Sequence, residues 1–215
     1  MAVFNNRKNC SLCLTNFARF LFVALIIFEL LNVLKILKLN TQFTWVGLFL
    51  TSIFCFIFVE MVAYKYRKEK GHNLHWSIWF LVAFGLSLDA AGDFFHLYGQ
   101  LSWWDQFAHF FVSGVVNFTA FVVISAFFVE GFRYNLLMKT GRFNLALLIS
   151  STSAISLGAL YEIEEYAEDL IFHTNRLGPR TDTANDLLFN FLGVVASIII
   201  IKIIYHLTKK EEVFE

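Results

Sequence analysis

The 215 residues carry no formal net charge and are 58% hydrophobic, with 27 phenylalanines, a single proline and a mean hydropathy of +0.62. Soluble domains are only about 45 to 50% apolar, so this composition excludes a soluble globular protein. We therefore expect an integral membrane protein, and no nucleic acid among its partners.

Six apolar stretches are each long enough to cross a bilayer, which takes about 20 helical residues. The first is too long for the apolar region of a signal peptide and lacks a small-residue cleavage site, so we interpret it as a retained span. The predicted fold class is all-α, a polytopic helical bundle in one integral membrane domain over 1–215, with short cytoplasmic tails at about 1–18 and 207–215. The six predicted spans cover 20–37, 43–64, 74–96, 105–129, 143–172 and 183–206.

The basic residues are distributed unevenly between the two predicted faces of the membrane. With six spans both termini lie on one side, and that side holds 13 basic residues against 4 on the other. Because basic residues concentrate in cytoplasmic loops, we place both termini in the cytoplasm of a bacterial cell, at the inner or plasma membrane. The other face then carries Lys35, Lys38, Arg176 and Arg180.

Carboxylates collect at the predicted outer ends of the last four spans. The stretch YEIEEYAEDL, at 161–170, places five acids at the end of an apolar helix, where the helix dipole is also negative. A counter-charge should therefore lie nearby. Ten of the 17 acidic residues belong to these ends: Asp89, Asp93, Asp105, Glu162, Glu164, Glu165, Glu168, Asp169, Asp182 and Asp186.

Helical spacing sorts these acids onto helix faces, since residues three, four and seven apart share a face. WWDQFAHFFVSG places Asp105 and His109 four apart, and TDTANDLLFNFLG aligns an acidic stripe with Gly193, where a second helix can pack closely. We expect Glu164 and Glu168 to face away from the site. The inward stripes are predicted to be Asp89, Asp93 and His96; Asp105 and His109; Glu162, Glu165 and Asp169; and Asp182, Asp186 and Asn190.

A divalent cation would neutralise this cluster, because unpaired carboxylates inside a bilayer cost several kcal/mol each. An oxygen-rich set suits Mg, Mn, Ca or Fe better than zinc, which prefers Cys and His. Glu165 and Asp186 are the candidate catalytic residues, and Asp89, Asp93, His96, Asn190 and Arg180 form a candidate secondary polar shell. The predicted metal ligands are Asp105, His109, Glu162, Glu165, Asp182 and Asp186.

A structural polar network is the alternative interpretation of the same residues. Arg176 and Arg180 lie in the same outer turn as the acids and can form ion pairs with two of them, while Asp182 and Thr183 can cap the last helix. The C-x-x-C of Cys10 and Cys13 lacks two further ligands for zinc, so we expect a reduced pair.

Three motifs, WWDQFAHFFVSG, YEIEEYAEDL and LGPRTDTANDLLFNFLGV, resemble in order the polar motifs of the YjdF-like family of bacterial inner-membrane proteins. The D-x-x-x-H segment and the D-x-x-x-D-x-x-x-N-x-x-G ending more loosely resemble VanZ-like proteins, a group connected with the cell envelope. GPRTD departs from the richer Gly and Gln content of the YjdF-like turn. The resemblance implies functional positions at Asp105, His109, Gly114, Tyr161, Glu162, Glu165, Asp182, Asp186 and Gly193.

Three functions fit these observations. The first is a metal-dependent hydrolase or transferase that acts on a lipid or lipid-linked envelope substrate at the extracytoplasmic face. The second is a cation-binding transporter or channel, although the inner helix ends carry no matching acids. The third is a non-catalytic scaffold whose polar cluster fixes the bundle.

Overall fold

The structure, a computed structural model, describes residues 2–129, 137 and 141–211, and within these ranges it contains helices and turns without strands. Six helices in the described residues are long and apolar enough to cross a membrane, which confirms the predicted helical membrane bundle. The chain divides into two compact units, Met1–Ser102 and Trp103–Glu215.

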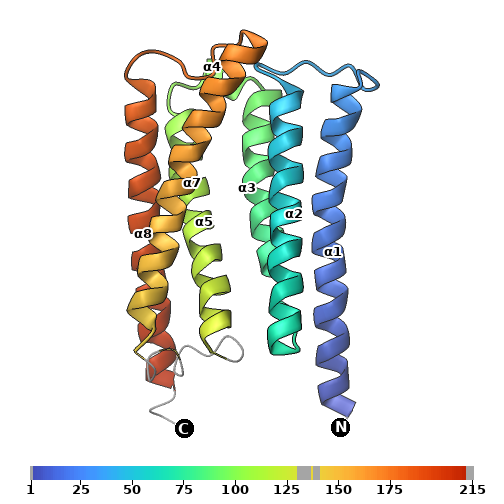
Figure 1. The fold of residues 1–215 in the computed structure, drawn as a ribbon, viewed down its shortest axis with the longest axis vertical. Helices are drawn as coiled ribbons and strands as arrows, with labels where there is room; N and C mark the ends of the chain where they lie inside the picture. The colour runs from blue at the N-terminus through green and yellow to red at the C-terminus, as the bar shows by residue number, and fades with distance from the viewer. Residues whose placement is uncertain (1, 130–136, 138–140, 212–215) are drawn as a thin grey trace. The chain divides into compact units, whose positions relative to one another are not determined.

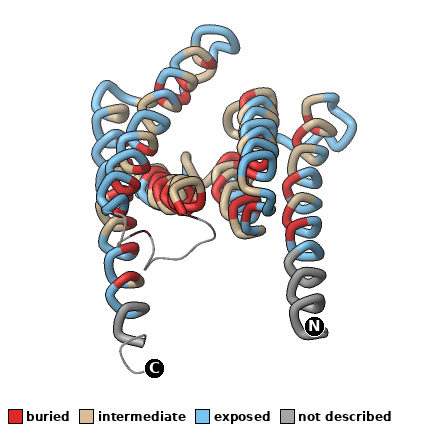
Figure 2. Tube along the Cα trace, turned by 60° about the horizontal axis from the view of Figure 1, so that its bottom comes forward, coloured by how far each residue is buried: buried red, intermediate tan, exposed pale blue. Residues whose placement is uncertain are grey.

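Large apolar side chains are exposed along the spans. On α2, for example, Phe54 is 66% exposed and Phe58 is 53% exposed. Figure 2 shows buried and exposed positions alternating along the long helices. In water such apolar surfaces drive association, whereas in a bilayer the lipid tails cover them. The chain is therefore a multi-pass membrane protein.

The first unit contains α1 (Ala2–Val33), α2 (Trp45–Lys70), α3 (Ser77–Phe94) and the short α4 (Leu97–Gln100). Thr44 caps the start of α2 by accepting a hydrogen bond from Val46 N, and Gly71 ends it at φ +70°.

A salt bridge joins the three long helices of this unit. The guanidinium of Arg19 donates to both carboxylate oxygens of Glu60, at 2.6 and 2.8 Å, and lies 4.6 Å from the ring centroid of Trp79. Trp79 Nε1 donates to the same carboxylate at 2.8 Å. The bidentate pair and the stacked ring hold α1, α2 and α3 together.

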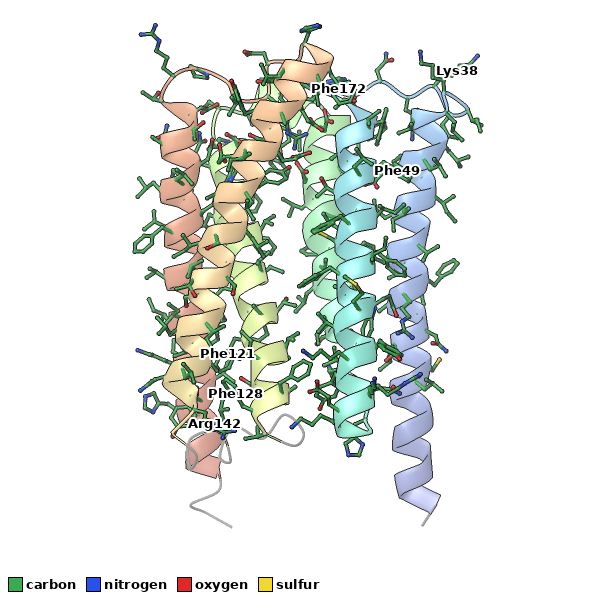
Figure 3. The ribbon with its side chains drawn as sticks, in the orientation of Figure 1. Lys38, Phe49, Phe121, Phe128, Arg142 and Phe172 are labelled. Carbon is green, nitrogen blue, oxygen red and sulfur yellow. The ribbon has the colours of Figure 1, made fainter. Side chains whose placement is uncertain are left out.

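The first helix differs from its predicted span at both ends. It begins at Ala2, inside the predicted tail, and it ends at Val33 rather than at residue 37. Lys35 and Lys38 adopt φ of 57° and 55°, left-handed conformations that interrupt the helix, and Figure 3 shows Lys38 in the loop beyond α1. The last helix likewise continues to Glu211, past the predicted start of the C-terminal tail at 207.

The second unit contains α5 (Trp104–Phe128), α7 (Phe143–Phe172) and α8 (Asp182–Glu211), each of which contacts the other two. Its apolar core lies toward the end where α5 stops and α7 starts (Figure 1). There Phe121 packs edge-to-face on Phe143, at 5.5 Å between ring centroids, and Arg142 donates to Phe128 O at 3.3 Å. In Figure 3 the labels of Phe121, Phe128 and Arg142 mark this end, and Phe172 marks the opposite end.

Two glycines let α5 and α8 touch backbone to backbone. A Cβ atom on Gly193 would collide with the carbonyl oxygen of Phe110, and one on Gly114 would lie 3.2 Å from the carbonyl oxygen of Gly193. The predicted close packing at Gly193 is thus confirmed. This contact brings the first turns of α5 and α8 together at the end of the unit where α7 stops.

Candidate metal centre

His109 is the centre of a polar cluster inside the second unit. Its Nε2 atom lies 3.5 Å from Oδ1 of Asp105, 3.7 Å from Oε1 of Glu162 and 3.8 Å from Oδ1 of Asp186. The three carboxylates come from α5, α7 and α8 respectively. One imidazole nitrogen therefore faces acids from all three helices of the unit.

Burial distinguishes the members of this cluster. The side chains of His109, Glu162 and Asp186 are 8%, 6% and 4% exposed, whereas that of Asp105 is 26% exposed. Asp105 lies in the first turn of α5, one helical turn before His109. The cluster is thus closed on the α7 and α8 sides and reachable from the side of Asp105.

Several carboxylate oxygens of the cluster lack hydrogen bonds. Among the residues that the structure describes, neither oxygen of Glu162 nor Oδ1 of Asp186 has a hydrogen-bond partner. Buried charged oxygens are normally hydrogen-bonded, paired or bound to a metal ion. Nε2 of His109 lies 3.7 Å from Oε1 of Glu162 and 3.8 Å from Oδ1 of Asp186, so these atoms form a candidate position for a bound cation.

The opposite nitrogen of the histidine is hydrogen-bonded. Nδ1 of His109 lies 3.2 Å from Oδ1 of Asn190, and Ser113 Oγ donates to the same oxygen at 2.5 Å. Asn190 is 3% exposed and lies on α8, one turn after Asp186. The imidazole ring is therefore held on one side by an amide and faces the acids on the other.

Arg176 is the buried cation beside this cluster. Its Nε donates to Oε1 of Glu165 at 2.9 Å, its NH1 lies 3.5 Å from Oε2 of Glu168, and its NH2 donates to the hydroxyl of Tyr161. The ion pairing that the alternative interpretation expected is therefore present for Arg176. Arg180, by contrast, is exposed.

A capped turn carries Arg176 back over the end of α7. His173 ends the helix at φ +55°, and the carboxylate of Asp169 accepts hydrogen bonds from Thr174 Oγ1 and from the backbone N–H groups of Arg176 and Leu177. Asp169 thus organises the turn after α7 instead of joining the inward acids Glu162 and Glu165.

The predicted outward orientation of Glu168 was wrong. This side chain is 4% exposed and faces Arg176, because the turn after α7 folds the guanidinium onto that face of the helix. Glu164, its predicted outward companion, is half-buried. Periodicity identified which acids share a face, but the position of Arg176 decides which faces are covered.

The other predicted site residues have different contacts. Glu165 is engaged by Arg176, and Asp182 is half-buried at the first residue of α8, where its carboxylate lies over Gly178. Asp89, Asp93 and His96 belong to the first unit. There Asp89 accepts from the Tyr98 hydroxyl at 2.6 Å.

Sequence reasoning missed two contributors to the site and the burial of a third. Ser113 lies four residues after His109 on α5, a helical spacing that the sequence displays. Gly158 lies four residues before Glu162, and a Cβ atom there would be 2.7 Å from Nδ2 of Asn190. The third is Arg176, whose burial depends on the geometry of the turn after α7. The sequence shows Asp169 and the length of this turn, but not its backbone conformation.

Neither Cys13 nor Cys55 is a member of this cluster. Cys13 is exposed and Cys55 is partly buried, and neither forms a disulfide within the described residues. The side chain of Cys10, the other half of the C-x-x-C motif, lies outside the part of the chain that the structure describes.

Comparison with known proteins supports the membrane assignment. No curated protein and no solved structure matches the chain. The looser resemblance to VanZ-like proteins therefore stays a prediction. A family model described as "Predicted membrane protein (DUF2238)" matches residues 17–207, which cover most of both units and every residue of the cluster. The chain thus belongs to the DUF2238 family of predicted membrane proteins.

Proposed function

We propose that the second unit binds one divalent metal ion between Asp105, His109, Glu162 and Asp186. The observation that carries this proposal is the convergence of three carboxylates on one imidazole nitrogen, at 3.5 to 3.8 Å. Asp105, His109 and Asp186 each offer a ligand atom, and these three atoms lie within 4.8 Å of one another.

The charges support a cation at this position. The guanidinium of Arg176 contacts the carboxylates of Glu165 and Glu168 and offsets one of their two negative charges. Asp105, Glu162 and Asp186 then remain around a histidine, with no Lys or Arg among the described residues that forms a salt bridge with them. Removing one partner from a buried charge group costs several kcal/mol, so an uncompensated set of three is unfavourable.

The separations also favour a shared ion over direct hydrogen bonds. A charge-assisted N–H to O⁻ bond is about 2.7 to 2.9 Å long, shorter than any of the three contacts. Two ligands bound to one metal at about 2.0 to 2.2 Å are about 3.3 to 3.6 Å apart at tetrahedral angles and about 2.8 to 3.1 Å apart at octahedral angles. The contacts at 3.5 to 3.8 Å would therefore shorten by at most about 0.5 Å in a tetrahedral site and by up to about 1 Å in an octahedral one.

We further propose that the metal centre serves a hydrolase or transferase of the cell envelope, with a lipid or lipid-linked substrate. A bound divalent metal ion polarises a phosphoryl or carbonyl oxygen and activates water. Asp105 forms the accessible side of the cluster, and Trp103, 55% exposed beside it, is a residue type that concentrates at the membrane interface. A lipid head group can approach from this side.

In this proposal Glu165 is neither a metal ligand nor a catalytic residue, although the sequence predicted both roles. Its carboxylate accepts a hydrogen bond from Arg176, so the ion pair of Glu165 and Arg176 influences the charge beside the metal without binding the metal. Asp186 is assigned as a ligand. Within the family, the three polar motifs favour a YjdF-like member, and the excess of basic residues at the other helix ends favours an extracytoplasmic site.

The test is a thermal-stability comparison of detergent-solubilised protein with and without chelation. Metal that binds only the folded state stabilises it by about 2.7 kcal/mol at a concentration 100-fold above Kd. We expect chelation to lower Tm and refilling with Mn²⁺ to restore it. Glu162→Gln should abolish this response, whereas the matched change Glu164→Gln on the same helix should keep it.

A catalytic assay follows from the same preparation. Mn²⁺-loaded and chelated protein are compared for phosphate release and acyl release from phospholipids and a polyprenyl diphosphate in micelles. Metal-dependent release that Glu162→Gln eliminates supports hydrolysis. An unchanged Tm on chelation and refilling of the wild-type protein contradicts the metal centre and removes the basis for metal-dependent catalysis.

A further inference from the structure

We infer that Asn190 makes the His109 cluster selective for Mn²⁺, Fe²⁺ or Zn²⁺ over Mg²⁺ and Ca²⁺, because its amide oxygen on Nδ1 directs the Nε2 lone pair toward the three carboxylates. This inference rests on the proposed metal centre and adds the class of metal and the residue that selects it. The relevant contacts are those of Nδ1 of His109, on the side of the imidazole ring that faces away from the acids.

The amide oxygen determines where the histidine proton lies. An amide oxygen only accepts hydrogen bonds, so at 3.2 Å from Oδ1 of Asn190 the Nδ1 atom of His109 carries the hydrogen. In the neutral ring the lone pair then belongs to Nε2. Ser113 Oγ donates to the same amide oxygen at 2.5 Å and fixes it from α5.

The amide group is fitted between α5 and α7. Its Nδ2 atom faces Gly158, where a Cβ atom would approach to 2.7 Å. Among the described residues Nδ2 of Asn190 has no hydrogen-bond acceptor. This orientation leaves a buried N–H group unsatisfied, and therefore needs a compensating interaction elsewhere.

A metal ion on Nε2 would strengthen the Nδ1–H to Oδ1 hydrogen bond that this orientation makes. Coordination withdraws electron density from the imidazole and makes Nδ1–H a stronger donor to the amide oxygen, the arrangement found for most metal-bound histidines. With the amide reversed, Nδ2 would donate to Nδ1 and the hydrogen would move to Nε2, facing Asp105, Glu162 and Asp186. The orientation of the Asn190 amide thus decides whether Nε2 of His109 carries a lone pair that can bind a metal ion or a hydrogen that bonds to the acids.

The same orientation predicts the class of metal. Mg²⁺ and Ca²⁺ take oxygen ligands, whereas imidazole nitrogen suits zinc, iron and related transition metals, and carboxylates also suit manganese. A nitrogen lone pair held among carboxylates therefore favours Mn²⁺, Fe²⁺ and Zn²⁺. The sequence alone, which shows five carboxylates and one histidine, predicted Mg, Mn, Ca or Fe ahead of zinc.

The first experiment measures selectivity on the full-length chain in detergent micelles. Mn²⁺, Zn²⁺, Mg²⁺ and Ca²⁺ are titrated separately into chelator-treated wild type, Asn190→Leu, Asn190→Asp and the matched control Asn185→Leu, with Tm as the readout. We expect wild type to bind Mn²⁺ and Zn²⁺ more tightly than Mg²⁺ and Ca²⁺. Asn190→Leu should weaken Mn²⁺ and Zn²⁺ binding by about 10- to 100-fold with little change for Mg²⁺.

The two other variants separate positioning from folding. Asn190→Asp keeps an acceptor for Nδ1–H and should retain Mn²⁺ and Zn²⁺ binding, and Asn185, exposed on the same helix, should tolerate leucine without effect. If Asn190→Leu weakens the binding of all four metals equally, or of none, Asn190 does not select the metal and the inference is overturned. Wild type that binds none of the four contradicts the metal centre itself, which is a distinguishable result.

The second experiment needs no variant of Asn190 and stands even if Asn190→Leu fails to fold. Nitrogen-15 NMR of histidine-labelled, Zn²⁺-loaded wild type reports which ring nitrogen of His109 binds metal, with His109→Gln used to assign the signal. We expect zinc on Nε2 and a proton on Nδ1. Zinc on Nδ1, or a protonated Nε2 in the loaded protein, overturns the inference.

Discussion

Arg176 Nε donates a hydrogen bond to Oε1 of Glu165 at 2.9 Å, and this contact divides the buried acids of the second unit into two groups. Glu165 and Glu168 share the guanidinium, while Asp105, Glu162 and Asp186 surround His109. The first group has one guanidinium for two carboxylates, whereas the second has only an imidazole for three. This difference is the reason for proposing a metal ion in the second group.

Arg176→Gln should strongly destabilise the protein. Removing one partner of a buried ion pair leaves an uncompensated charge and costs about 3 to 5 kcal/mol, here for the carboxylates of Glu165 and Glu168. Thermal unfolding in detergent measures the change. Arg180→Gln, in the same turn but exposed, should change stability by less than about 0.5 kcal/mol, and equal effects of the two variants would contradict the buried pairing.

Gly193→Ala should destabilise the contact between α5 and α8. The new Cβ atom would collide with the carbonyl oxygen of Phe110, which is backbone and moves only if the helices separate. Overpacking of this kind typically costs about 1 to 3 kcal/mol. Ser156→Ala, at an exposed position of α7, is the control, and a Gly193→Ala variant with wild-type Tm would show that the helices do not cross this closely.

Asp93→Ala should destabilise the first unit without affecting the metal response. Asp93 is 0% exposed, and its Oδ1 accepts a hydrogen bond from Phe43 N at 2.8 Å, which fixes the loop before α2. Leaving that buried N–H without its acceptor costs about 1 to 3 kcal/mol. The measurement is Tm with and without Mn²⁺.

The metal-dependent difference in Tm is the informative quantity for this variant. If Asp93→Ala abolishes it, Asp93 acts in the polar shell of the metal site, as its place in the sequence pattern predicted. If only the baseline Tm falls, its role is to hold the first unit together.

Membrane topology is tested by cysteine labelling in intact cells. With native Cys10, Cys13 and Cys55 replaced, a cysteine at Asn175 should react with a membrane-impermeant maleimide, because the basic residues place the turn after α7 outside. Asn175 is exposed in the structure, so access is not limited by burial. A cysteine at Lys68 should react only after lysis, and the reverse pattern would place the His109 cluster on the cytoplasmic side.

The sequence sufficed to predict the spans because bilayer thickness imposes a length and a composition that hydropathy detects directly. Helix ends were less predictable. Residues 34–37 are apolar enough to extend the first span, but Lys35 and Lys38 leave the helical conformation, and hydropathy does not report backbone dihedral angles.

Helical periodicity likewise predicted which acids share a face, since the stripe of Asp105 and His109 meets Glu162 and Asp186 in space. Periodicity did not predict the burial of acids whose surroundings depend on the turn after α7. Asp169 caps the turn that carries Arg176 onto Glu165 and Glu168, so the covered face of α7 is wider than the spacing indicates. Long-range placement of a single arginine is not encoded in any local pattern.

The metal content of the purified chain shows whether the His109 cluster holds a metal ion. After Mn²⁺ loading and removal of free metal, elemental analysis of wild type, His109→Gln and the exposed control His206→Gln gives the metal bound per chain. We expect about one equivalent for wild type and His206→Gln and a large loss for His109→Gln, because coordination requires the imidazole ligand. Wild type without bound metal, together with an NMR signal showing His109 protonated on both nitrogens, would contradict it, since the imidazolium would then be the counter-charge of the three acids.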